Sequence, residues 1–133
     1  MKLEFLDNIS VGGKSPQVVS EQLVRLYGFG PSQALLLKET IQKNIIDGKE
    51  EINLSSLEFI DAINCNLAFQ ISNEDTGITT NDKCNFVCSM TIKGYETMVY
   101  LIEPFCHRDS AGYQWLYDLD YAIDFLFSPG GTW

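Results

Sequence analysis

Basic residues are scarce in this sequence. Lys and Arg number 9 against 18 Asp and Glu, which gives a net charge of -9 at pH 7 and a pI near 4.4. Proteins that bind nucleic acids neutralise phosphates with basic side chains, and anionic membrane surfaces also attract basic segments. The composition therefore argues against a nucleic-acid or membrane partner. It favours a basic protein partner, whose approach an acidic surface accelerates, although the charge can also serve solubility alone.

Long apolar runs are also absent. No stretch approaches the ~18 apolar residues of a membrane-spanning helix. The segment MKLEFLDNIS at the start lacks the apolar core of a secretory signal, so we expect the protein in the cytoplasm. The chain has 133 residues, of which 45% are hydrophobic, and this is enough for a core without a metal or disulfide. Residues 1–133 are predicted to form a single domain.

Histidine and cysteine are few, and the spacing of the cysteines does not predict a metal site. The chain has one histidine, His107, and four cysteines, Cys65, Cys84, Cys88 and Cys106. If the strand predicted around Cys88 extends back to Cys84, the two residues lie ~13 Å apart along it. Two ligands of one zinc ion must lie much closer. We therefore expect free thiols, no metal and no cofactor.

The segment GGKS at residues 12–15 matches only the end of the GxxxxGK[ST] pattern of phosphate-binding loops. Asn8 stands where that pattern needs its first glycine, and Pro16 interrupts the helix that should follow. A nucleotide site is therefore not predicted.

The clearest periodic pattern lies in residues 113–127, YQWLYDLDYAIDFLF. Its odd-numbered positions are all apolar or aromatic, whereas the even-numbered positions include Gln114, Asp118, Asp120 and Asp124. Successive side chains of a strand point to opposite faces. The pattern predicts one long strand, or a strand bent midway, with an apolar face and an acidic face.

Two helices are predicted from apolar residues at helical spacing. The first begins at Pro31 or Ser32 and ends at Gly48, and the second begins at Gly94 and ends at Pro104. Further strands are predicted from alternating or apolar segments near residues 1–9, 21–29, 51–54, 57–71 and 85–93.

The last two of these strands are expected to be antiparallel neighbours across a polar turn at residues 73–83. Strands with one polar face are typical of antiparallel sheets with one side in water. We therefore predict an α+β fold of two layers, a mainly antiparallel sheet of about five to six strands with two helices packed on one face. The polar residues expected to share its open face are Asn64, Asn66, Gln70, Ser89, Thr91, Asp118 and Asp120.

Three carboxylates of the acidic strand are the first candidates for a binding site. Asp118 and Asp120 would lie about 7 Å apart between α-carbons on one face, and Asp124 would continue the row. Such a row can dock a basic protein, bind a divalent cation or act as acid and base, or merely discourage aggregation. Our hypothesis is docking, with Tyr113 and the terminal Trp133 as aromatic contacts.

A second hypothesis is a small enzyme or small-ligand-binding domain. Its cleft would lie in the curve of the sheet near His107, with Cys106 as the neighbouring thiol. Adjacent residues of an extended chain point apart, so adjacency alone does not make a catalytic pair. A third hypothesis is a structural or assembly domain, which an exposed aromatic patch would support.

In size, acidity and lack of a catalytic constellation, the chain resembles the small bacterial immunity proteins that neutralise secreted toxins. This resemblance is one of composition and size. It implies a non-catalytic protein-binding module that covers a basic partner such as a nuclease toxin, by steric cover and charge complementarity.

Overall fold

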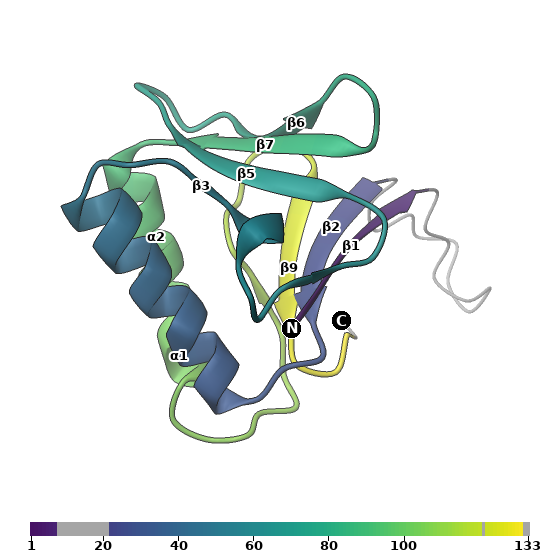
Figure 1. Ribbon diagram of the computed structural model, residues 1–133, viewed down its shortest axis with the longest axis vertical. Coiled ribbons are helices and arrows are strands. Elements are labelled where there is room, and N and C mark those ends of the chain that lie inside the picture. Colours follow the sequence, from purple (N-terminus) through teal and green to yellow (C-terminus); the bar gives the residue numbers. More distant parts are fainter. Residues whose placement is uncertain (8–21, 121, 132–133) are drawn as a thin grey trace.

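The computed structural model describes residues 1–7, 22–120 and 122–131. Two helices and two mixed β-sheets make up an α+β fold, which confirms the predicted class. Figure 1 shows the two helices side by side on one side of the strands. The segment at residues 12–15 and Trp133 lie outside the described residues.

The first sheet has five strands in the order β4-β1-β2-β9-β8. The β1–β2 and β8–β9 pairs are antiparallel, whereas β1–β4 and β2–β9 are parallel. In β1, Leu3 and Phe5 alternate with polar residues and are buried, as the period of a strand requires. The strands are β1 (Lys2–Asp7), β2 (Gln22–Tyr27), β4 (Asp61–Ala62), β8 (Gln114–Trp115) and β9 (Asp124–Ser128).

The second sheet has four strands in the order β3-β5-β7-β6. Its central pair, β5 and β7, is parallel, so the predicted antiparallel hairpin of these segments is wrong. The reason is a strand at residues 77–80, inside the polar segment predicted to be a turn, which becomes the antiparallel neighbour of β7. The strands are β3 (Ile52–Asn53), β5 (Asn66–Ile71), β6 (Gly77–Thr80) and β7 (Asn85–Met90).

The aromatic segment 113–127 does not form one strand. Its ends form β8 and β9, which pair with each other as an antiparallel hairpin, with Trp115 opposite Leu126. Asp118 and Asp120 therefore lie in the loop between two strands and not in a row along one. The predicted open face is wrong, because Asn66, Gln70 and Ser89 belong to the second sheet, whereas Asp118 and Asp120 lie in this loop. Asn64 precedes β5, and Thr91 is the N-cap residue of α2.

Both predicted helices are present. α1 (Pro31–Thr40) continues into a π-helical segment (Ile41–Asp47) that ends before Gly48. α2 (Ile92–Ile102) begins two residues before the predicted Gly94, because Thr91 caps it by accepting a hydrogen bond from the Gly94 N–H at 3.0 Å. No helix in the described part of the chain is long and apolar enough to cross a membrane.

One hydrophobic core lies between the two sheets and the helices. Phe5 of the first sheet meets Phe86 of the second with ring centroids 4.7 Å apart. Phe69 and Phe125 make a similar contact between the sheets at 6.0 Å. Aromatic pairs at such distances add to the stabilisation that burial alone provides.

Tyr117 joins the two sheets through its hydroxyl group. The hydroxyl accepts a hydrogen bond from the backbone N–H of Ile78 in β6 at 3.0 Å and donates one to the carbonyl of Ile123. The same two isoleucines form a β-bridge between the sheets. Burial raises the pKa of Tyr117, so the hydroxyl keeps its proton and continues to donate.

Replacing Tyr117 by Phe removes both of these hydrogen bonds at a buried position. We expect the free energy of unfolding to fall by about 1–3 kcal/mol, since a buried N–H loses its partner. Urea denaturation followed by tryptophan fluorescence measures this loss. Tyr100→Phe is the matched control, because Tyr100 is 76% exposed. Equal stability of the two variants would contradict the bridging role.

Candidate functional site

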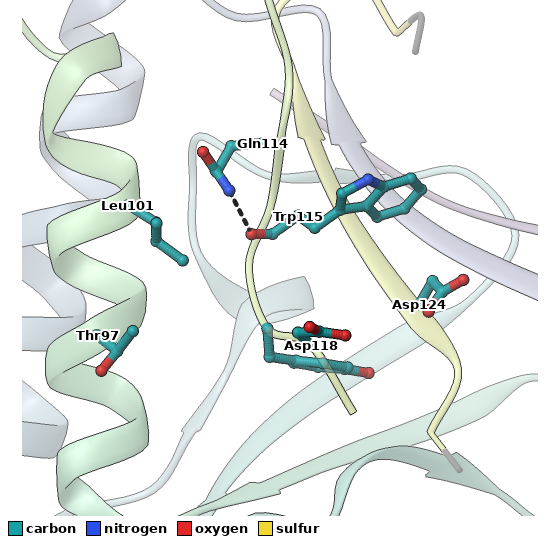
Figure 2. Close-up of a pocket in the computed structure, with 7 residues that line it drawn as sticks. Thr97, Leu101, Gln114, Trp115, Asp118 and Asp124 are labelled. Atoms are coloured by element: carbon teal, nitrogen blue, oxygen red, sulfur yellow. Dashed lines mark hydrogen bonds between the residues drawn. The ribbon is translucent and has the colours of Figure 1, made fainter. Parts of the chain in front are cut away.

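A groove lies between α2 and the β8–β9 hairpin and has a volume of about 610 Å³. We call it the α2 groove (Figure 2). The wall on the helix side consists of Thr97 and Leu101. The opposite wall consists of Gln114, Trp115, Tyr117, Asp118 and Asp124.

Two of the three predicted carboxylates line this groove. Asp124 is the first residue of β9, and Asp118 lies in the loop that connects β8 to β9. Trp115 pairs with Leu126, so Asp124, two residues before Leu126, lies on the same sheet face as Trp115. The groove thus combines carboxylates with an aromatic ring, a pairing that suits a cation.

The third carboxylate, Asp120, lines a second hollow of about 570 Å³. Asp118 lines both hollows, and both Asp118 and Asp120 are exposed. A small hollow of about 160 Å³ also borders Asp118 and reaches down to α2. The three predicted carboxylates therefore line two hollows that share Asp118, although they do not form a row on one strand.

Gly77 determines how closely the loop approaches the second sheet. Its φ of 78° lies in the left-handed region, which glycine adopts readily. A Cβ at this position would lie 2.6 Å from the Cβ of Ala122 and 3.1 Å from the Tyr117 ring. The loop that carries Asp118 and Asp120 therefore packs directly against the β6 backbone at Gly77.

Sequence reasoning missed Asp75, which lines the second hollow together with Asp118 and Asp120. Its Oδ1 accepts hydrogen bonds from the N–H and the hydroxyl of Thr91 at 2.8 and 2.9 Å, at the start of α2. A carboxylate is stabilised there by the helix dipole. The sequence offered one signal for this part of the site. Thr91 stands just before an apolar helical segment, as an N-cap residue typically does.

The predicted aromatic contacts lie in different places. Tyr113 is 49% exposed and meets the Trp115 ring edge-on, with centroids 6.1 Å apart. It does not line the α2 groove, whereas Trp115, which was not predicted as a site residue, does. Trp115 therefore links the exposed Tyr113 to the carboxylates of the groove.

His107 and Cys106, the alternative site, have separate partners. The His107 Nε2 lies 2.6 Å from Oε1 of Glu103, on the exposed side of the chain. The Cys106 thiol is buried and donates to the carbonyl of Ile102 at 3.6 Å. Lys38 and His107 together lower the pKa of Glu103 through hydrogen bonds, with the Lys38 contribution larger. Neither His107 nor Cys106 lines either of the two large hollows.

Within the described ranges, no group of three or more His, Cys, Asp or Glu side chains is arranged to bind a metal ion. Comparison of the chain with known protein families, with curated proteins and with solved structures found no match.

The environment of the cysteines predicts which thiol reacts. Burial raises the pKa of Cys65 to about 11 and that of Cys88 to about 12, and it also raises the pKa of Cys106. Because the thiolate is the nucleophile, these thiols react slowly at neutral pH. We expect iodoacetamide to modify the exposed Cys84 at least about tenfold faster than the other three.

Peptide mapping by mass spectrometry measures the four rates, and the unfolded protein in urea is the control in which they should converge. Modification of Cys106 as fast as Cys84 in the folded protein would contradict this and would favour a reactive thiol beside His107.

Proposed function

We propose that the protein is a non-catalytic binding module whose α2 groove receives a basic segment of a partner protein. The observation that carries this proposal is the position of Asp118 and Asp124 beside Trp115 in one open groove. Carboxylates attract Lys and Arg side chains, and the face of a tryptophan ring attracts the same cations. An immunity-type inhibitor that covers a basic toxin is the kind of protein this arrangement fits.

The charge balance around the groove supports a basic partner. Among the described residues, no ion pair includes Asp118, Asp120 or Asp124. The pairs that are present lie elsewhere and join Arg25 to Glu4, Lys38 to Glu103, Lys83 to Asp7 and His107 to Glu103. Carboxylates gathered without counter-charges repel one another, and a bound cation relieves that repulsion.

The extent of the acidic surface supports a macromolecular partner over a small ligand. The α2 groove and the second hollow share Asp118 as a lining residue. Their volumes are about 610 Å³ and about 570 Å³, respectively. Either volume alone falls in the usual range of a small-molecule site. A chain segment that crosses the loop between them can use both, with the net charge of -9 attracting it from a distance.

The experiment replaces Asp118, Asp120 and Asp124 together by Asn and measures association with the basic proteins that the wild type retains from a lysate of its source organism. We expect the association rate at low salt to fall by about tenfold or more, because steering by charge accelerates encounter by that order. The difference should shrink at high salt, where such charges are screened.

A matched control replaces Glu39, Glu50 and Glu58 by Gln, since these exposed residues do not line either hollow. This control changes the net charge by the same amount at a different place. Equal association rates for the wild type and the Asn variant would refute the proposal. Equal losses in both variants would show that net charge alone matters and would also refute it.

A further inference from the structure

The α2 groove runs along an edge of the first sheet at which no further strand of the described residues pairs. β8 is the last strand in the order of the first sheet. Gln114 and Trp115, as neighbours in a strand, point to opposite faces of the sheet, yet both line the α2 groove. Both residues belong to the terminal strand β8, so the groove borders this strand.

The backbone of Trp115 faces this edge. The N–H of Leu116 donates to the carbonyl of Phe125 at 2.9 Å, toward β9. Alternate residues of an antiparallel strand direct their N–H and C=O groups to opposite sides. The N–H and C=O of Trp115 therefore point away from β9, and Figure 2 shows this carbonyl on the side of α2.

A side chain of the same strand covers part of the edge. The Gln114 Nε2 donates to the Trp115 carbonyl at 2.9 Å, in the place that a neighbouring strand would otherwise fill. Exposed edges that lack such cover invite pairing with another chain. The Gln114 amide can rotate away from the Trp115 carbonyl, so the main chain of another strand can replace it.

The charges at the edge select what can pair there. An added strand points alternate side chains to each face. Asp124 lies on the same face as Trp115, and Asp118 borders the groove where the loop begins. Lys or Arg at alternate positions of the added strand would reach these carboxylates, whereas an acidic strand would be repelled.

We infer that the basic partner segment binds in extended form and adds to the first sheet as a strand beside β8, with the Trp115 N–H and C=O as its main-chain contacts. This inference depends on the proposed function and specifies how the partner is held. Main-chain pairing gives affinity in such strand addition, and the alternating side chains give specificity. The Gln114 amide leaves the Trp115 carbonyl when the segment enters.

A synthetic peptide of alternating Lys and Val, with blocked ends, is a direct probe. Titration into ¹⁵N-labelled protein at low salt gives the Kd, and hydrogen exchange gives the protection of each amide. At a peptide concentration about ten times the Kd, the Trp115 amide should exchange about tenfold more slowly. The Leu116 amide, which already donates to Phe125, should change little and is the internal control.

Two further peptides separate main-chain pairing from charge. The same Lys-Val sequence, N-methylated at its central residues, keeps every charge but loses backbone donors, and it should bind at least about tenfold more weakly. A Glu-Val peptide should not bind. Equal binding of the methylated peptide, an unprotected Trp115 amide, or no binding of the Lys-Val peptide at all would overturn strand addition.

The outcomes also distinguish this inference from the proposed function. The Lys-Val peptide could bind the wild type, bind the Asn variant of Asp118, Asp120 and Asp124 about tenfold more weakly, and leave the Trp115 amide unprotected. That result would support the proposed function of the acidic groove and would refute strand addition. Equal protection of the Trp115 amide in the wild type and the Asn variant would show that β8 pairs with a strand of any charge. Both the inference of a basic strand and the proposed function would then be refuted.

Discussion

The hydroxyl of Tyr117 is the contact on which the arrangement of the two sheets depends. It accepts a hydrogen bond from the Ile78 N–H of one sheet and donates a hydrogen bond to the Ile123 carbonyl beside the other. The hydrogen bond from the Ile78 N–H is buried, where water cannot replace a lost partner, whereas the bond to the Ile123 carbonyl is only partly buried. Because Tyr117 is also a wall of the α2 groove, the bond that joins the sheets fixes one side of the groove as well. Tyr117 therefore contributes both to the stability of the fold and to the shape of the groove.

The sequence predicted the elements better than their partners. The apolar stripe of residues 31–48 required a helix, and α1 with its π-helical continuation occupies that range. The alternation in residues 113–127 correctly predicted strands near both ends of the segment, but the same alternation also runs through the loop between β8 and β9. Leu116 and Tyr117, adjacent in the chain, are both buried, which a strand with two different faces does not allow. Local periodicity contains no information about where a chain turns back.

The pairing of β5 with β7 failed for a related reason. The residues of β6, Gly77–Thr80, include two threonines in a polar segment, so their pattern resembled a turn. Their strand conformation comes from the ladder with β7 and from the bridge to Ile123, both of which are tertiary contacts. Such contacts override local preference in strands more than in helices. The carboxylates were identified from the alternation in residues 113–127, while Asp75 and Trp115 became visible as site residues only once the loop was placed.

The acidic loop illustrates how a fold can hold repelling charges together. The loop that carries Asp118 and Asp120 packs closely against Gly77 and is tied to both sheets by the Tyr117 hydroxyl. Asp75 is held nearby through Thr91 at the start of α2. Their repulsion is offset by packing already present in the free protein. A cation that enters the groove gains from carboxylates already in position, so little ordering remains to oppose binding. Like charges placed near the edge of a sheet are thus the physical basis on which we propose that a basic strand would be preferred.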